Sequence, residues 1–344
     1  QSYARLGQLP AQAQVVLEAR SPDATWVVGH TPGGTLRGWL AAGYLLVDHA
    51  ALEALPVSTE PVASLPVGGG EAAAPTTPIT TQAIIDVSLS TEALAHAREL
   101  FAAGQALGNQ PDSFIAIGDS AVGGNVDTLP MFHSIVNRTY ELGDYAYLQH
   151  TIDYFSRTFS FYVERGTARA GNGTINILDP LLADPALCEP GENALACEIR
   201  RQHPGVALVY IGFVDLSVST VEQYAANLDT ILQQCMASGV IPVLTTLTAS
   251  RSTLAGYNNV ERFDAMNNAI RGFAAGYALP LIDLQVAAAG LPNQGTRTND
   301  GVHLSYSAAG QVSFAGDQHR YGSDLRELLT LLMLDTLRIN VLGG

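Results

Sequence analysis

The sequence predicts an α/β protein with a parallel sheet covered by helices on both faces, preceded by a small all-β domain. From about residue 84 onward, strand-length apolar runs alternate with helix-length segments. The runs are continuously apolar, and strands of that kind are buried on both faces, as in parallel sheets. In residues 1–50, short β-type segments are instead separated by Asp/Pro/Gly turns, which predicts a small antiparallel barrel or sheet.

The composition is typical of a folded chain that does not bind nucleic acid. The 344 residues are enough for two domains, and 47% of them are apolar. The net charge is −15, and all 17 basic residues are arginine. Because a basic surface is needed to displace counterions from phosphates, we expect no nucleic-acid partner. Only 14% of the residues are charged. A well-solvated surface carries about 25–35%, so the low value favours a surface partly covered in an assembly.

The first fifty residues contain three segments with strand character, separated by the turns SPDA and TPGG: residues 14–19, 25–30 and 36–45. Between about residues 56 and 82, Pro, Thr, Ser, Ala and Gly dominate the composition, which is typical of a linker. We therefore expect a small β domain over residues 1–55, a linker over 56–82 and an α/β domain over 83–344.

The α/β domain begins with a helix over residues 90–107, for which Ser90 is the N-cap candidate. The elements that follow are strand 114–120 ending in a turn, strand 206–215, helix 221–239, strand 240–247, helix 263–277 and strand 279–284. The richest apolar stretch, residues 325–342, also contains four charged residues: Arg326, Glu327, Asp335 and Arg338. We expect an amphipathic helix there and no membrane span, because a span needs about 18–20 uninterrupted apolar residues.

Polar residues that can perform hydrolysis follow the predicted strands, where α/β sheets bind their ligands. Ser120 ends the segment Gly-Asp-Ser directly after the first strand, and Asp300 and His303 lie three residues apart on a late loop. A serine nucleophile needs a base within about 3 Å and an acid that orients the base. One turn of the late loop can supply both, so the three residues form a candidate catalytic triad. The alternative is an ordinary turn and an ordinary Asx-type loop.

The segments IGDS at 117–120 and DGVH at 300–303 resemble the first and last blocks of the SGNH (GDSL-type) hydrolases. The resemblance covers residues 112–340. It implies a flavodoxin-like three-layer sandwich and a serine esterase, with Ser120 as nucleophile, His303 as general base and Asp300 as the residue that orients it. We expect no cofactor and no metal.

The same resemblance predicts an impaired oxyanion hole. The family combines the serine N–H, a glycine N–H and the asparagine side chain of G-x-N-D/E. The glycine here is Gly171 or Gly173, and the sequence leaves that choice open. Val214 in GFVD replaces the asparagine, and Asn125 is a candidate substitute donor. Loss of one donor typically costs about 10²–10³ in rate.

The cysteines indicate export. Cys188 and Cys197 flank a short polar loop, and we predict a disulfide between them, the alternative being two unpaired core thiols. Cys235 lies near the end of a helical segment and is expected to be a buried free thiol. The chain begins at Gln1 without a basic or apolar leader, so we expect that a signal peptide has been removed and that the protein is extracellular or on the cell surface.

Residues 21–45 resemble the second half of bacterial Src-homology-three-like domains, on the basis of Trp26, Trp39 and Tyr44. The opening strand of such domains is absent, which predicts an unpaired sheet edge that invites pairing with another chain. The three aromatic residues form either a ligand platform or the core of the barrel. Four acidic residues offer either a cation site or a solvated face: Asp179, Asp184, Glu189 and Glu192.

Two functions follow from these features. The first, which we favour at this point, is an exported SGNH-fold protein that self-assembles into a filament, tube or sheath and retains the triad as scaffold. Its partner would be a second copy of the chain, bound through the barrel edge and the linker, and a cell-wall glycan or peptide is the alternative partner. The second is an active serine esterase that acts on acylated glycans, lipids or small esters.

Overall fold

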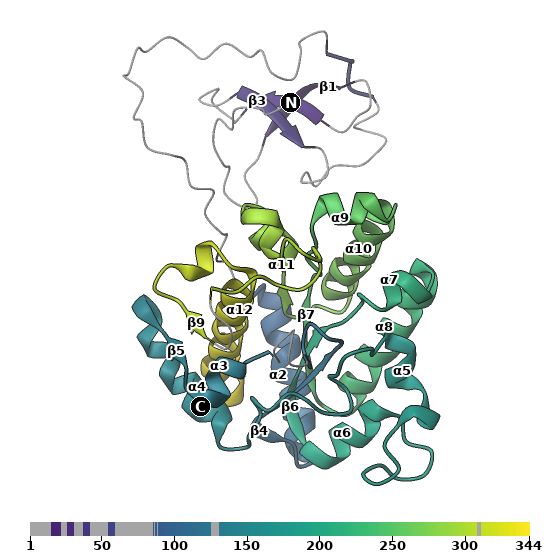
Figure 1. Ribbon diagram of the computed structural model, residues 1–344, viewed down its shortest axis with the longest axis vertical. Coiled ribbons are helices and arrows are strands. Elements are labelled where there is room, and N and C mark those ends of the chain that lie inside the picture. Colours follow the sequence, from purple (N-terminus) through teal and green to yellow (C-terminus); the bar gives the residue numbers. More distant parts are fainter. Residues whose placement is uncertain are drawn as a thin grey trace. The chain divides into compact units, whose positions relative to one another are not determined.

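The computed structural model describes residues 15–21, 26–30, 37–41, 54–58, 85, 87, 89–124, 131–307 and 311–344. The chain divides into two compact units, Gln1–Pro78 and Ile79–Gly344. The first unit contains a small antiparallel sheet, and the second contains a parallel sheet with helices around it (Figure 1).

The small β unit contains three antiparallel strands in the order β1-β2-β3: Val16–Arg20, Trp26–His30 and Arg37–Ala41. This confirms the antiparallel sheet predicted for the N-terminal region. Val27 and Val28 on the central strand are buried. Trp39 is half-buried, whereas the side chain of Trp26 and all of Tyr44 lie outside the described residues. The likeness to Src-homology-three-like domains stays a prediction.

The outer edge of β1 is partly paired by the protein's own chain. Arg20 N–H donates to the carbonyl of Pro56 at 2.9 Å, and Ser58 N–H donates to the carbonyl of Arg20 at 2.8 Å. Residues 56–58, which the sequence assigns to the linker, therefore belong to the small β unit. Residues 59–82 of the predicted linker lie outside the described residues.

The second unit is built on a four-stranded parallel sheet in the order β4-β6-β7-β8 (Figure 1): Gln110–Gly118, Pro204–Tyr210, Ile241–Thr245 and Leu281–Ile282. Every residue of β6 and β7 is buried, which is the reason for their continuous apolar sequence. The predicted α/β class and parallel sheet are confirmed. A second, two-stranded parallel sheet was not predicted, because strands of two residues carry no periodic signal: β5 (Tyr140–Glu141) and β9 (Val312–Ser313).

Two groups of long helices flank the sheet (Figure 1). One group packs side by side and consists of α6 (Ala194–Gln202), α8 (Val221–Ala237) and α10 (Val260–Gly276). The other consists of α2 (Thr91–Ala106), α4 (Gln149–Ser156) and α12 (Gly322–Leu337), which a π-helical turn, Arg338–Leu342, extends toward α2. The shorter helices are α3 (His133–Asn137), α5 (Thr174–Leu178), α7 (Asp215–Val218), α9 (Arg251–Gly256) and α11 (Leu284–Ala288). Single 3-10 turns cover Gly143–Leu148, Pro180–Leu182, Pro292–Gly295 and Asp317–His319.

Local signals account for the position of α2. The Ser90 hydroxyl accepts a hydrogen bond from Ala93 N–H at 3.1 Å, which confirms Ser90 as the N-cap. Toward its other end, α2 approaches the turn between α8 and β7 very closely. A Cβ atom on Gly104 would lie 2.2 Å from the carbonyl oxygen of Gly239, so the contact requires glycine at residue 104.

The C-terminal helix α12 is buried on almost all sides, so the prediction of an amphipathic helix was wrong. Its charged side chains are buried because they find partners inside the protein. Glu327 accepts hydrogen bonds from Phe132 N–H at 3.1 Å and from the Ser134 hydroxyl at 3.2 Å. Asp335 pairs with Arg338 at 2.8 Å. Charged side chains that the sequence would suggest are exposed to solvent therefore connect α12 to the rest of the fold.

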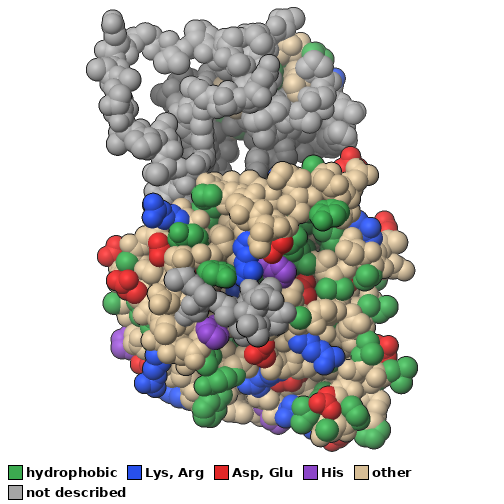
Figure 2. Space-filling model, viewed as in Figure 1, with side chains coloured by type: hydrophobic (Ala, Val, Ile, Leu, Met, Phe, Trp, Pro, Cys, Tyr) green, Lys and Arg blue, Asp and Glu red, His purple; other side chains and the backbone are tan. Residues whose placement is uncertain are grey.

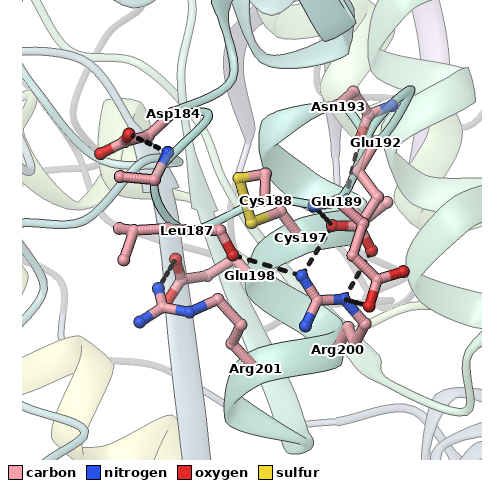
Figure 3. Close-up of a disulfide and its surroundings, with 12 residues drawn as sticks. Asp184, Leu187, Cys188, Glu189, Glu192, Asn193, Cys197, Glu198, Arg200 and Arg201 are labelled. Atoms are coloured by element: carbon pink, nitrogen blue, oxygen red, sulfur yellow. Dashed lines mark hydrogen bonds and ion pairs between the residues drawn. A yellow bond between two sulfur atoms is a disulfide. The ribbon is translucent and has the colours of Figure 1, made fainter.

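The predicted disulfide between Cys188 and Cys197 is present, with a Cα–Cα distance of 5.1 Å (Figure 3). It ties the loop before α6 to that helix. Arg200 on the same helix reaches back to the loop and binds Glu192 at 2.7 Å. Cys235 is a buried free thiol, as predicted, and burial raises the pKa of its thiol to about 12, so it is not a reactive nucleophile.

The low charge content is visible on the surface. On the face shown in Figure 2, charged side chains are scattered among backbone and uncharged polar groups. Across the part of the chain that the structure describes, no helix combines the length and the apolar character needed to cross a bilayer.

We expect the substitution Asp324→Asn to change how stability depends on pH. Asp324 on α12 is fully buried; its Oδ1 accepts from Ser313 N–H at 2.9 Å, and its Oδ2 has no hydrogen-bond partner among the described residues. Burial, with the nearby charges of Glu327 and Asp317, raises the pKa of this carboxyl to about 7. Because the unfolded-state pKa is near 4, the folded chain binds the proton more tightly, and wild type loses stability as pH rises from about 4 to 7.

The asparagine side chain of the variant cannot ionise, so the variant should lose less stability than wild type as the pH rises. Relative to wild type, its free energy of unfolding should rise by up to about 3 kcal/mol between pH 5 and pH 8. Urea unfolding of both proteins at the two pH values measures this difference. The same pH dependence in both proteins would contradict the assignment.

Candidate active site

The structure brings Ser120, His303 and Asp300 together. Ser120 lies two residues beyond the end of β4, and its hydroxyl oxygen is 2.9 Å from Nε2 of His303. The other ring nitrogen of His303, Nδ1, is 3.1 Å from Oδ2 of Asp300. This is the order of contacts that a nucleophile, its base and the residue orienting the base require.

The loop that carries His303 is fixed by its own backbone. Oδ1 of Asp300 accepts from the N–H groups of Val302 at 2.8 Å and His303 at 2.9 Å. Gly301 has a φ of +69°, and a Cβ atom there would lie 1.9 Å from Oγ1 of Thr253, so only glycine fits. Burial alone would raise the pKa of Asp300, but the two N–H groups and the His303 ring outweigh it, and the pKa is lowered. Asp300 is therefore ionised at neutral pH.

Asp119, the residue before the serine, connects the ends of β4 and β6. It is completely buried; Oδ1 accepts from Ala121 N–H at 2.9 Å, and Oδ2 accepts from Phe213 N–H at 3.1 Å. Burial raises the pKa of Asp119 to about 6, although these hydrogen bonds and the charge of His303 lower it. No role was predicted for this residue. Its position directly after a buried strand was the available signal.

Arg326 of α12 holds the turn that carries Ser120, residues 118–121, from the interior; we call it the serine turn. Its guanidinium is buried, donates a hydrogen bond to the carbonyl of Ala121, and lies 5.7 Å from the ring centre of Tyr210. The backbone of Ala121 is thus held by Asp119 at its N–H and by Arg326 at its carbonyl. The sequence gives no sign of this contact, because an arginine in a predicted amphipathic helix looks the same whether it is buried or exposed.

A second buried carboxylate fixes the glycine-containing loop, residues 171–174. Asp215, at the start of α7, accepts hydrogen bonds from the N–H of Thr174 at 3.0 Å and from its hydroxyl at 2.5 Å. Because Asp119 binds the neighbouring Phe213, the loops after β4 and β6 and the loop before α5 form one connected unit.

Among the residues that the structure describes, no complete set of oxyanion donors comes together. Gly173 N–H is already bound to Oδ1 of Asn176 at 2.8 Å, and Gly171 is exposed with open space around it. The Val214 side chain lies 3.4 Å from where a Cβ on Gly173 would be. Asn125 lies outside the described residues. Ser120 N–H has no acceptor within the described ranges, so it is available to an oxyanion.

The acidic loop favours the solvated-face interpretation over a cation site. Asp179 and Asp184 accept from backbone N–H groups two residues further on, each at 2.9 Å. Glu192 is held by Arg200, whose hydrogen bond lowers the pKa of the carboxyl to about 2. Two sulfurs lie close to Glu192, but they are bonded to each other in the disulfide and are not free to bind a metal (Figure 3).

No protein-family model matches the chain, and no curated protein sequence matches it. Among solved structures, a lipase/acylhydrolase from Enterococcus faecalis is 16% identical with a TM-score of 0.41, over 65% of this chain and 95% of that one. A GDSL-like lipase from Bacteroides thetaiotaomicron is 14% identical with a TM-score of 0.40, over 71% and 98%. A carbohydrate esterase family 3 protein from Talaromyces cellulolyticus is 12% identical with a TM-score of 0.41, over 66% and 98%. At these identities and scores the likeness says nothing about the activity of this chain.

We expect Arg326→Met to slow the reaction of Ser120 with a serine-reactive fluorophosphonate. Methionine fills a similar volume but cannot hold the Ala121 carbonyl, so the serine turn loses one of its two fixed points. Misplacement of a reacting group by about 1 Å can cost about 10²-fold, and a loss of tenfold or more in labelling rate is expected. Mass spectrometry after timed exposure measures it.

The matched control is Arg338→Met, which removes the ion pair to Asp335 just beyond the same helix. It should lower the melting temperature but leave the labelling rate unchanged. If Arg326→Met does not fold, Arg326→Lys, which keeps the charge and one donor, replaces it and should label at an intermediate rate. Equal rates in the Arg326 variant and the control would show that Arg326 does not position Ser120.

Proposed function

We propose that the α/β unit is a serine hydrolase of carboxylic esters related to the SGNH (GDSL-type) hydrolases. One observation carries the proposal: the Ser120 hydroxyl lies 2.9 Å from His303 Nε2 while Nδ1 lies 3.1 Å from Asp300. The two motifs that resemble the family, IGDS and DGVH, supply these three residues. The parallel sheet places Ser120 at its carboxyl edge, where α/β enzymes bind substrates.

The geometry supports a two-step acyl transfer. Ser120 Oγ attacks the ester carbonyl carbon as its proton passes to Nε2 of His303, and a tetrahedral oxyanion forms. Asp300 orients the ring through Nδ1 and stabilises the imidazolium. Collapse of the intermediate breaks the bond to the alcohol, which leaves with the proton from Nε2. Water, activated by the same nitrogen, then adds to the acyl-serine and releases the carboxylic acid.

Asp119 also contributes to the electrostatics of this step. Burial raises the pKa of the Asp119 carboxyl to about 6, although the charge of His303 lowers it. Asp119 is therefore mostly ionised above pH 6 and mostly protonated below it. The imidazolium formed in each step therefore interacts with two carboxylates, Asp300 directly and Asp119 from the interior.

The oxyanion hole limits the rate. Ser120 N–H is available, but Gly173 N–H is engaged by Asn176 and Val214 offers no donor. We therefore propose a slow esterase. The alternative, a self-assembling extracellular subunit, stays a prediction: it depends on the sheet edge and the linker, and the chain itself pairs part of that edge. An extracellular location is a proposal supported by the disulfide.

Purified protein should hydrolyse 4-nitrophenyl acetate or butyrate, and Ser120→Ala should abolish the activity because no other group lies at hydrogen-bond distance from Nε2 of His303 in the described residues. Release of nitrophenol measures the rate. Ser217→Ala, an exposed serine on α7, is the control and should match wild type. Equal activity, or equal inactivity, of wild type and Ser120→Ala would refute the proposed function.

We expect Val214→Asn to accelerate the reaction. Val214 comes directly after Phe213, whose N–H donates to Asp119, and its side chain lies against Gly173. An asparagine amide at residue 214 therefore supplies a hydrogen-bond donor close to the turn that carries Ser120. One such donor is typically worth about 10²–10³ in kcat, and a gain of at least tenfold in kcat with 4-nitrophenyl acetate is expected. The control is Val218→Asn, at the exposed end of α7. If neither variant has a higher kcat than wild type, the valine at residue 214 does not account for the slow rate.

A further inference from the structure

We propose that Arg169 and Arg297 select esters that carry an anionic group, such as a carboxylate, a sulfate or a phosphate, beside the scissile bond. The inference rests on the proposed esterase function and specifies its substrate class. It depends on two features of the structure. The backbone of Arg297 is bonded to His303 and that of Arg169 to Gly118, two residues before Ser120. Neither arginine is paired with a carboxylate of the described residues.

Arg169 neighbours the nucleophile. Gly118 and Ala168 form a parallel bridge along the edge of β4 that faces away from β6, and Arg169 N–H donates to the carbonyl of Gly118 at 3.3 Å. Because paired strands lie about 4.8 Å apart, this register places Arg169 beside Asp119, one residue before Ser120. The Arg169 side chain is exposed, and within the described part of the chain only its Nε has a partner, Oδ1 of Asn172 at 3.4 Å.

Arg297 neighbours the base. Thr296 and Leu304 form an antiparallel bridge, so Arg297 lies directly opposite His303, and its N–H donates to the His303 carbonyl at 2.9 Å. Directly opposed residues in such a pair have Cβ atoms about 5 Å apart and extend to the same side. The guanidinium lies 4.8 Å from the ring centre of Tyr306, and its Nε donates to the Leu304 carbonyl at 3.3 Å.

Arg169 and Arg297 each donate a hydrogen bond through Nε. Their terminal guanidinium nitrogens have no acceptor among the residues that the structure places. Six other arginines of the α/β unit are paired with carboxylates in the described residues, as Arg271 is with Asp283 at 2.7 Å and Arg251 with Asp264 at 2.8 Å. Arg169 and Arg297 have no such partner there, so their terminal nitrogens stay available to an anion from outside the chain.

The chemistry of the two side chains defines the ligand. A guanidinium with free terminal nitrogens presents parallel N–H groups that match the oxygens of a carboxylate, sulfate or phosphate. The two carboxylates of the site do not oppose this, because Asp119 is buried under the serine turn and Asp300 is bound to two N–H groups and to His303. Since Ser120 and His303 are in contact, an anion held by either arginine lies near the ester carbonyl.

Two matched pairs of esters test the inference and locate the charge. For an anion on the acyl side, the pair is 4-nitrophenyl hydrogen adipate and its neutral methyl ester. For an anion on the alcohol side, it is 4-acetoxybenzoate and its methyl ester. We expect wild type to prefer the anionic member of at least one pair by about tenfold in kcat/KM, and the preference should shrink as salt screens the charges.

The double variant Arg169→Gln, Arg297→Gln should lose about tenfold in kcat/KM for the preferred anionic ester and less than twofold for its neutral partner. Arg98→Gln is the control; this exposed arginine on α2 donates to the Asn340 carbonyl and should leave both rates unchanged. No charge preference in wild type, or an equal loss for both members of a pair, overturns the inference while the esterase function stands. Absence of Ser120-dependent hydrolysis of all four esters overturns both.

Discussion

The candidate site depends on one buried carboxylate, Asp119, which joins the ends of two adjacent parallel strands. A carboxylate removed from water is costly unless its oxygens accept hydrogen bonds, and the N–H groups of Ala121 and Phe213 satisfy this need. The same contacts bend the chain after β4 so that Ser120 meets His303. A second buried carboxylate, Asp215, continues the connection to Thr174. The loops therefore behave as one rigid unit whose geometry is set by buried charge.

Charge inside the α/β unit is arranged very differently from charge on its surface. The exposed face is sparsely charged, whereas α12 carries Asp324, Arg326, Glu327 and Asp335 in the interior. The last three of them contact segments more than 180 residues away, so these residues determine which loops α12 packs against. The proposed substrate selectivity uses two arginines that have no carboxylate partner among the described residues, Arg169 and Arg297.

Much of the architecture and the core of the site were predictable from the sequence. β6, β7 and the second half of β4 are continuously apolar, and IGDS lies at the end of β4, so local signals sufficed for these elements. Asp300 and His303 were recognisable because DGVH is a short local motif. The contact of Arg326 with Ala121 could not be predicted, because it joins residues 205 positions apart. The burial of α12 was missed for the same reason: a charged side chain looks identical in the sequence whether it meets water or a distant carbonyl. The engagement of Gly173 by Asn176 likewise depends on how a short loop folds back on itself.

The position of Arg326 has a consequence for biosynthesis. The serine turn is translated about two hundred residues before the arginine that holds it, and His303 also comes late in the chain. Because a chain emerges from the ribosome in N-to-C order, β4 and β6 can pair while Ser120 still lacks both its base and its support. An incomplete chain therefore carries no assembled nucleophile. The candidate site is therefore complete only when α12 has been made and packed against the turn that carries Ser120.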